Sequence, residues 1–271
     1  MSPLGTPDGV KPPTRRQLRQ LPLLRRDSMG PSYHVLTFDA SEEIVAFPGQ
    51  FAMVRGAAWG QAPLLPRPMS LLEPGRRPSI LIKIVGEGSR RLAHASPGEP
   101  FDLLLPLGNR WSPCPPGHTP VLVAGGVGVA PLLFFARELA AAGQTSVTLY
   151  GGRSANDLPL HDELARVSEV HLLTEDGSRG TRGRVTALLE PIIRDAKGPI
   201  KIYTCGPDRM MAAVAAIAQK MSVPCEASLE TPMACGYGVC LGCPVRRTSG
   251  GYLYACMDGP CVDARDVAWE N

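Results

Sequence analysis

Residues 234–256 read ACGYGVCLGCPVRRTSGGYLYAC and contain four of the eight cysteines in this 271-residue chain. The spacing C-x4-C-x2-C-x12-C is the plant-type ligand spacing of a [2Fe–2S] cluster, in which a tight loop supplies three thiolates and a later segment the fourth. Glycines alternate with these cysteines and let the backbone bend tightly around an inorganic core. The stretch therefore predicts electron transfer, with four metal ligands: Cys235, Cys240, Cys243 and Cys256.

Two alternatives to this ligand set stay open at the level of sequence. Four thiolates also suit a tetrahedral zinc ion, although a zinc site usually shows two C-x2-4-C pairs and only one pair here has that spacing. Cys261 lies five residues beyond Cys256 and could be the fourth ligand instead, but the strand-like GYLYAC before Cys256 favours Cys256. The scattered Cys114, Cys205 and Cys225 are interpreted as small buried apolar side chains.

Composition bounds the class of protein. The length suits two domains, or two domains and a small appended module, and 44% hydrophobic with 20% charged residues is typical of a soluble globular protein. A net charge of +3 is too small to indicate nucleic acid as a partner. No apolar run reaches the roughly 20 residues of a membrane span, and the N-terminus lacks an apolar secretory segment. We expect a cytoplasmic protein with no membrane partner, whose cysteines are reduced rather than paired in disulfides.

The first half of the chain divides into an extension and a strand-rich domain. Residues 1–28 are rich in proline and arginine, and they are expected to form a disordered basic extension. Residues 29–115 contain short apolar runs bounded by turn residues, which predict an antiparallel β-barrel or sandwich. These runs are YHVLTFD (33–39), QFAMVR (50–55), SILIKIVG (79–86) and FDLLLPLG (101–108).

Two pieces of this strand-rich domain suggest phosphate binding. RPMS (67–70) places an arginine after a proline-rich turn, where its planar fork could hold a phosphate. VGEGS (85–89) is predicted to be a loop whose N–H groups and hydroxyl could approach another phosphate. A surface arginine and an ordinary hairpin turn would explain the two pieces equally well.

Residues 116–224 alternate between apolar strands and helical stretches. VLVA (121–124), SVTLY (146–150), EVHLLT (169–174) and IKIYT (200–204) are the expected strands, with helices expected after the first strand and around 160–167, 186–195 and 208–221. This alternation predicts a parallel sheet with helices on both faces. Ligands bind such sheets beyond the carboxyl ends of the strands.

Two turns stand at those strand ends. GGVGVAP (125–131) has the G-x-G of a dinucleotide-binding loop, but Pro131 replaces the third glycine of the strict fingerprint. A strand, a glycine-rich turn and a helix N-terminus still form an anion site, although tight turns also use glycine without any ligand. The predicted nucleotide-binding residues are Gly126, Gly128, Cys205 and Gly206.

The order of motifs resembles a known family of flavoproteins. The family motifs in order are PGQF (48–51), RPMS, GEGS (86–89), PLGN (106–109), GGVGVAPL, CGP (205–207), the cysteine loop and CMDGP (256–260). The chain is similar to ferredoxin reductases and, because the cluster is C-terminal, to the electron-transfer subunits of NAD-dependent, class 1B dihydroorotate dehydrogenases. The resemblance runs from about residue 33 to the end.

This resemblance implies a fold, cofactors and site residues. The fold would be an FAD-binding antiparallel β-barrel (29–115), an NAD-binding parallel α/β domain (116–224) and a small [2Fe–2S] module (225–271). The four cysteine ligands would be those named above. The flavin contacts would be Arg67, Pro68, Met69, Ser70, Ile82, Lys83, Ile84, Gly88 and Ser89, with serine at 89 where threonine is usual.

The resemblance also implies a function and a partner. An FMN-containing catalytic subunit would oxidise dihydroorotate, and electrons would pass through the cluster and FAD to NAD⁺ within a heterotetramer. No residue of this chain would be catalytic towards dihydroorotate, and the basic extension and Cys261 have no role in the family. The rivals are an NAD(P)H-dependent ferredoxin-type reductase or diaphorase subunit, and a zinc-stapled, ligand-binding regulator without redox chemistry.

NAD is predicted over NADP. Arg153 is a lone cation after the second strand of the α/β domain. A protein that binds the 2′-phosphate of NADP would show a cluster of cations there. Glu175 and Asp176 follow the next strand and would repel that phosphate.

Overall fold

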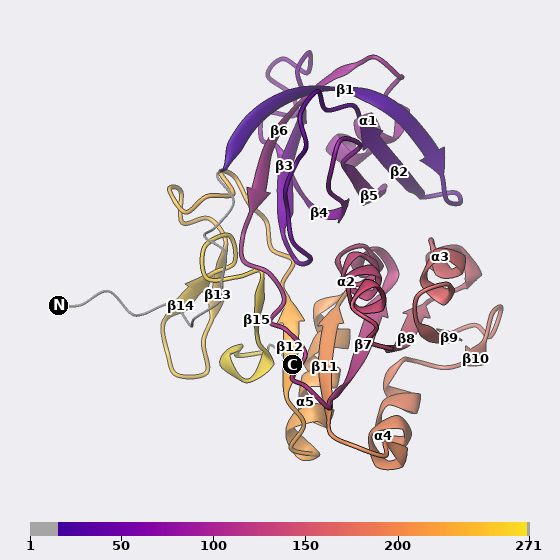
Figure 1. Cartoon of the computed structure of the whole chain (residues 1–271). Helices are drawn as coiled ribbons and strands as arrows, with labels where there is room; N and C mark the ends of the chain where they lie inside the picture. Colours follow the sequence, from indigo (N-terminus) through magenta and orange to yellow (C-terminus); the bar gives the residue numbers. More distant parts are fainter. Residues whose placement is uncertain (1–15, 270–271) are drawn as a thin grey trace.

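The computed structural model describes residues 16–269. A β-barrel lies above an α/β domain, and a small C-terminal module lies beside both (Figure 1). Among the described residues, no helix is long and apolar enough to cross a membrane.

Six strands close the barrel in the order β1-β2-β5-β4-β3-β6, and each neighbouring pair is antiparallel. The four apolar runs predicted as strands form β2, β3, β5 and β6, whose inward side chains, such as Phe38 and Phe101, fill the barrel. The strands are β1 (Gln17–Ser28), β2 (Tyr33–Phe38), β3 (Phe51–Gly56), β4 (Arg67–Glu73), β5 (Ser79–Lys83) and β6 (Pro100–Leu107).

The predicted disordered extension is wrong for its second half. Gln17–Ser28 form β1, which pairs with both β2 and β6 and closes the barrel. Leu21 and Leu23 point into the core, whereas Arg25 and Arg26 are exposed. The arginines and the proline of this segment obscure the alternation of buried and exposed side chains that is typical of a strand. Residues 1–15, the rest of the predicted extension, lie outside the described residues.

The GEGS segment is a helix start rather than the predicted loop. It opens α1 (Glu87–His94), so Gly88 and Ser89 lie in the first helical turn. The Ser89 hydroxyl accepts hydrogen bonds from the backbone N–H groups of Val85 and Gly86, at 2.9 and 3.1 Å. These bonds satisfy donors near the helix N-terminus that have no partner within the helix.

The α/β domain is built on a seven-stranded sheet in the order β10-β9-β8-β7-β11-β12-β15. All neighbouring pairs are parallel except β12 with β15. The chain runs outwards from β7 to β10 and then returns to β11 beside β7, so the strand order reverses between β7 and β11. The strands are β7 (Thr119–Gly125), β8 (Val147–Gly152), β9 (Glu169–Thr174), β10 (Thr181–Arg182), β11 (Ile200–Cys205), β12 (Cys225–Ser228) and β15 (Cys261–Asp263).

Helices cover both faces of this sheet, as the alternating pattern predicted. Val121 and Val123 of β7 pack in one core, and Leu122 and Ala124 pack in the other, which explains why the run VLVA is apolar throughout. In Figure 1, α2 lies between the sheet and the barrel, and α4 and α5 lie at the bottom. The helices are α2 (Val129–Ala141), α3 (His161–Ala165), α4 (Thr186–Asp195) and α5 (Asp208–Lys220), with short 3-10 turns η1 (Gly126–Gly128), η2 (Ala155–Asp157) and η3 (Ala264–Asp266).

The C-terminal module contains a hairpin of β13 (Pro244–Arg246) and β14 (Tyr252–Tyr254) and then returns to the sheet as β15. β12, which the predicted boundary at residue 225 assigned to this module, pairs with β11 of the α/β sheet. We therefore propose domain limits that follow the pairing: residues 17–107 for the barrel, 119–228 for the α/β domain and 229–269 for the module, with β15 as its anchor.

Candidate functional site

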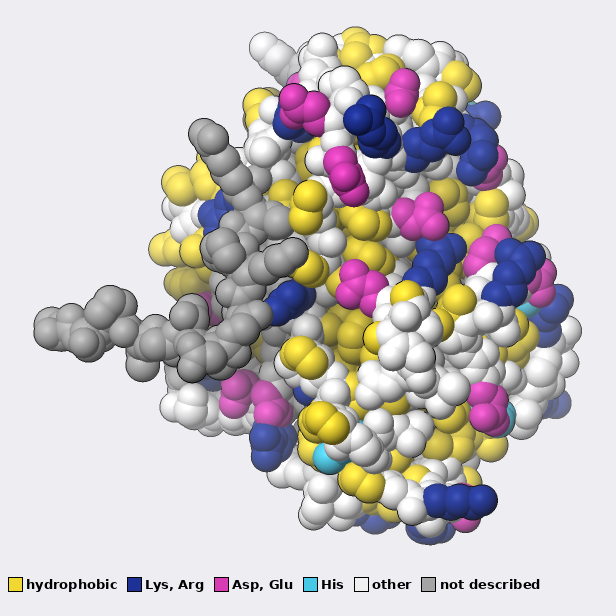
Figure 2. Space-filling model, in the orientation of Figure 1, with side chains coloured by type: hydrophobic (Ala, Val, Ile, Leu, Met, Phe, Trp, Pro, Cys, Tyr) yellow, Lys and Arg dark blue, Asp and Glu magenta, His cyan; other side chains and the backbone are white. Residues whose placement is uncertain are grey.

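A cleft of about 590 Å³ lies between the barrel and the carboxyl ends of β7, β11 and β12. Figure 2 shows hydrophobic side chains along the hollow between the upper barrel and the lower domain. A largely apolar concave site with few polar groups is the usual form of a cofactor site. Nine of the thirteen predicted cofactor residues line the cleft: Arg67, Pro68, Met69, Ser70, Lys83, Gly88, Ser89, Gly126 and Gly206.

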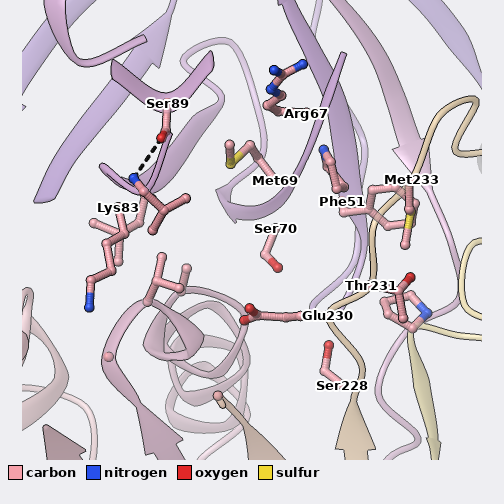
Figure 3. Close-up of a pocket in the computed structure, with 18 of the residues that line it drawn as sticks. Phe51, Arg67, Met69, Ser70, Lys83, Ser89, Ser228, Glu230, Thr231 and Met233 are labelled. Atoms are coloured by element: carbon pink, nitrogen blue, oxygen red, sulfur yellow. Dashed lines mark hydrogen bonds between the residues drawn. The ribbon is translucent and has the colours of Figure 1, made fainter. Parts of the chain in front are cut away.

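The barrel side of the cleft carries the positive charge. Arg67 and Ser70 come from β4, and Arg67 lies at the top of the cavity in Figure 3. A Cβ added to Gly88 would lie 2.1 Å from Nε of Arg67, so the glycine is what lets the guanidinium lie against the start of α1. The arginine and the helix start thus form one anion-binding corner of the kind expected for a diphosphate.

The opposite side is formed at the point where the strand order reverses. A Cβ on Gly128 would meet the carbonyl oxygen of Cys205 at 2.3 Å, so this glycine lets the loop after β7 pack against the end of β11. Gly126 has φ +53°, and its carbonyl accepts a hydrogen bond from the Tyr150 hydroxyl at 3.1 Å. Such switch points are where nucleotides bind in open α/β sheets.

Four predicted cofactor residues do not line the cleft. Ile82 is fully buried in the barrel core, and Ile84 packs against the same core. Gly128 and Cys205 are buried where the two loops meet. All four residues pack within the protein rather than against the cleft. A role for their backbone atoms in cofactor binding stays a prediction.

Sequence reasoning missed one wall of the cleft. This wall follows β12, and none of the predicted flavin or nucleotide motifs covers it; its residues are Ser228, Leu229, Glu230, Thr231 and Met233. Their position immediately before the cysteine loop was the available signal. Phe51 and Pro260, from the PGQF and CMDGP motifs, also line the cleft.

The four predicted cluster ligands come together as two pairs. Sγ of Cys243 and Sγ of Cys256 are 3.2 Å apart, and both side chains are buried. Sγ of Cys235 accepts the backbone N–H of Cys240 at 3.5 Å, and Cys240 is exposed. Among residues 16–269, no three His, Cys, Asp or Glu side chains surround a single metal-ion position.

The environment of Cys235 favours a thiolate. Partial burial raises the pKa of its thiol, but the N–H groups of Cys240 and Tyr237 donate to the sulfur and lower the pKa to about 6. The pKa of Cys256 is instead raised to about 12 by burial and by the neighbouring Cys243. Thiolates are the metal-ligating form of cysteine, so a nearby cation is needed to hold Cys256 ionised. Two pairs of cysteine sulfurs, with N–H groups that donate to Cys235, fit a two-iron cluster, in which each iron takes two protein ligands.

Cys261 lies apart from these pairs. It belongs to β15, and its backbone N–H and C=O both bond to the Asn109 side chain, at 2.9 and 2.7 Å. Its sulfur would be 2.5 Å from a Cβ on Gly49, so it fills a tight space between the barrel and the sheet. Cys261 therefore supports the domain junction.

The cysteine loop packs against the barrel and directly continues the cleft wall. A Cβ on Gly236, which has φ +77°, would lie 2.4 Å from Cγ of Met53 on β3. Met233 lines the cleft, and Cys235 is two residues later, so their Cα atoms are at most about 7 Å apart. The cysteine pairs thus adjoin the cofactor cleft.

Comparison with known proteins agrees with this arrangement. Residues 230–268 match the iron–sulfur cluster binding domain of dihydroorotate dehydrogenase B, and residues 122–216 match an oxidoreductase NAD-binding domain. A dihydroorotate dehydrogenase B (NAD⁺) electron transfer subunit from Desulforamulus reducens is 34% identical over 89% of this chain and 95% of its own length. The chain belongs to this family of electron transfer subunits. The corresponding subunit from Bacillus caldolyticus is 37% identical over 81% of this chain and 86% of its own length.

Solved structures confirm the predicted fold class. A chain of the NADH-dependent reduced ferredoxin–NADP oxidoreductase superposes with a TM-score of 0.81 at 24% identity, over 92% of this chain and 90% of that one. The ferredoxin reductase of carbazole 1,9a-dioxygenase superposes with a TM-score of 0.69 at 19% identity, over 79% and 68% of the two chains. The predictions of an oxidoreductase subunit, with FAD, NAD and iron–sulfur cofactors and a catalytic partner subunit, are confirmed at the level of the family.

Proposed function

We propose that this chain transfers electrons between a dihydroorotate-oxidising catalytic subunit and NAD⁺, in pyrimidine biosynthesis. The observation that carries the proposal is the continuity of the site: one cleft joins an anion-binding corner of the barrel to the switch point of the sheet, and its wall reaches Met233, two residues before Cys235. When bound, FAD exchanges electron pairs with nicotinamide and single electrons with a [2Fe–2S] cluster.

The residues of the chain bind and orient these groups. Arg67 and the N–H groups around Gly88 would hold the flavin diphosphate, because a guanidinium forms paired, charge-assisted hydrogen bonds with phosphate. Gly126 and Gly206 would let a nicotinamide nucleotide approach the backbone at the switch point. Cys235, Cys240, Cys243 and Cys256 would hold the cluster. No described residue is assigned to proton abstraction from dihydroorotate, which belongs to the partner.

The surface around the cysteine loop supports a docked catalytic subunit. Val239 and Leu241, on either side of Cys240, are 74% and 54% exposed. Tyr237, Tyr252 and Met257 of the same module are also exposed large hydrophobic side chains. Several exposed large hydrophobic side chains within one small module typically mark a protein interface. We propose that the FMN-containing catalytic subunit covers these five residues, and that the two subunits form a heterotetramer.

A cytoplasmic location is part of the same proposal. All eight cysteines are free in the structure, as expected in a reducing compartment.

Reconstitution tests the proposed function. The purified chain, loaded with its cofactors, should reduce dyes with NADH but form no orotate, and addition of the catalytic subunit should allow dihydroorotate to reduce NAD⁺. Cys240→Ser should abolish that NAD⁺ reduction, whereas Cys114→Ser should not. Oxidation of dihydroorotate by the isolated chain would contradict the proposal. Rapid reduction of ferredoxin by NADH, with no complex formed, would instead favour a ferredoxin-type reductase.

The docking surface has its own test. Val239→Asp should weaken the complex at least tenfold in analytical ultracentrifugation while NADH–dye activity is kept. Val45→Asp is the matched control, because Val45 is 56% exposed on the barrel and lies outside the cysteine module. Equal effects of the two substitutions would place the interface elsewhere.

A further inference from the structure

Glu230 differs from the other charged residues of the cleft. The charged side chains that line the cleft are Arg67, Lys83, Glu87 and Glu230. Lys83 pairs with Asp157, Glu87 pairs with Arg90 and Arg91, and Arg67 donates to the carbonyl of Leu65. Within residues 16–269, no cation lies at ion-pair distance from Glu230; the Cys205 thiol lies 3.8 Å from its Oε1.

The position of Glu230 suits an exchange of protons with the cofactor cleft. It follows β12 in the wall of the cleft, and it precedes Cys235 by five residues. In Figure 3 its carboxylate points into the cavity towards Ser70 of the barrel. The neighbouring Thr231 has a buried hydroxyl without a hydrogen-bond partner. Two residues whose polar groups lack strong partners therefore line the space that the cofactors would fill.

The surroundings of Glu230 oppose its ionisation. Glu230 is accessible from the open cleft, but protein atoms crowd around its carboxyl, and this desolvation, followed by the negative Asp208, raises the pKa of the carboxyl to about 7. The Cys205 thiol on β11 acts in the opposite direction. From the barrel side, the cleft is lined by the cations Arg67 and Lys83 and by Glu87. A bound cofactor that displaces water would favour the neutral acid further.

We propose that Glu230 is the proton-exchanging group of the cofactor cleft, binding a proton from solvent when electrons enter the cleft and releasing it when they leave. This inference rests on the proposed function, because the electrons come from NADH or from the catalytic subunit. For each reduction, one O–H bond forms on the carboxylate with a proton from water, and the carboxylate itself gains no electrons. The added proton offsets one negative charge, which stabilises the reduced state of the cleft.

Proton uptake on reduction tests the proposal. The cofactor-loaded chain is reduced with NADH in weakly buffered solution at pH 7, and a pH-indicator dye reports the protons bound. Compared with wild type, Glu230→Gln should bind up to about half a proton less per reduction, because a group with a pKa near the ambient pH is half ionised. The difference should shrink below pH 6, where the carboxyl is already protonated.

Glu87→Gln is the matched control, since Glu87 also lines the cleft. Hydrogen bonds from Arg91 and Arg90 lower the pKa of its carboxyl, so it stays ionised and its replacement should leave proton uptake unchanged. Glu230→Asp keeps a titratable carboxyl and should keep most of the extra uptake. Equal uptake by wild type and Glu230→Gln, with the flavin reduced in both, would overturn the proposal while leaving the proposed function intact.

Infrared difference spectroscopy provides a test on wild type alone. The reduced-minus-oxidised spectrum should contain a protonated carboxyl band that shifts in ²H₂O and is lost in Glu230→Gln. A wild-type spectrum without such a band would overturn the proposal even if the variants failed to bind FAD. If NADH reduced nothing in the loaded chain, the proposed function would fail, and this inference with it.

Discussion

Lys83 of the barrel donates a hydrogen bond from Nζ to Oδ1 of Asp157 in the α/β domain, over 3.1 Å. The hydroxyl of Tyr33 donates to the same oxygen at 2.9 Å, and Nζ of Lys83 lies 5.0 Å from the centre of the Tyr33 ring. Lys83 also lines the cofactor cleft. One carboxylate thus joins two barrel side chains to the nucleotide-binding domain at the edge of the cleft.

Removal of this carboxylate should loosen the two domains. Asp157→Ala is expected to raise KM for NADH several-fold with a smaller change in kcat, and to destabilise the fold by about 1 kcal/mol, since the pair is only partly buried. Steady-state kinetics and thermal unfolding measure both effects. Glu42→Ala, which removes the exposed Arg19–Glu42 pair of the barrel, is the control. An unchanged KM in Asp157→Ala would show that the contact does not orient the nucleotide domain.

The same contact should weaken in acid. Burial raises the pKa of Asp157, but the hydrogen bonds from Lys83 and Tyr33 outweigh burial and hold the pKa below its ordinary value. Stability from a lowered carboxyl pKa is present above the unfolded value, about 3.9, and is lost as pH falls through the folded one. Wild type should therefore exceed Asp157→Asn in unfolding free energy at pH 7, and the difference should shrink as the pH falls below about 3.9. A constant difference from pH 7 to 3 would contradict this assignment.

The cysteine variants should separate ligands from structural thiols. Serine at Cys235, Cys240, Cys243 or Cys256 should remove most of the bound iron and acid-labile sulfide. Cys261→Ser should keep both, because Cys261 belongs to β15 of the sheet and its side chain lies against Gly49 of the barrel domain. Iron and sulfide analysis of the purified chain measures the result. Full iron content in Cys256→Ser, with loss in Cys261→Ser, would reverse the assignment of the fourth ligand.

Flavin affinity should depend on Arg67 and on the glycine beside it. Arg67→Ala should weaken FAD binding by about 1.5–3 kcal/mol, the value of a hydrogen bond to a charged group. Gly88→Ala should weaken binding as well, because the new Cβ would displace the guanidinium. Arg76→Ala is the control, because Arg76 is an exposed arginine of the barrel that does not line the cleft. Isothermal titration with FAD gives the affinities, and equal Kd values for all three variants would refute the role of Arg67.

The choice of nicotinamide should follow the acids after β9. Asp176 accepts hydrogen bonds from the backbone N–H and hydroxyl of Ser178, at 2.9 and 2.6 Å, and these bonds lower the pKa of its carboxyl, so it is charged at neutral pH. We predict at least a tenfold higher kcat/KM for NADH than for NADPH, and a several-fold smaller ratio in Glu175→Gln/Asp176→Asn. Glu99→Gln, on the barrel, is the charge control. A preference of the wild-type protein for NADPH would show that Glu175 and Asp176 do not exclude the 2′-phosphate.

The sequence by itself determined the features that depend on spacing and local pattern. The cysteine spacing, the order of motifs and the apolar runs predicted the cluster module, the barrel and the parallel sheet, because ligand geometry and side-chain periodicity are local properties. Helix positions were predicted within a few residues, as for α4 and α5.

Only the tertiary structure decided which segments meet. β1 is charged and contains a proline, so its sequence does not indicate a strand. It is a strand because it pairs with β2 and with β6, which is distant in sequence. Glu230 lines the cleft because β12 pairs beside β11, and Cys261 is separated from the cluster because β15 pairs with β12. These placements depend on strand register and domain packing, which no short sequence pattern encodes.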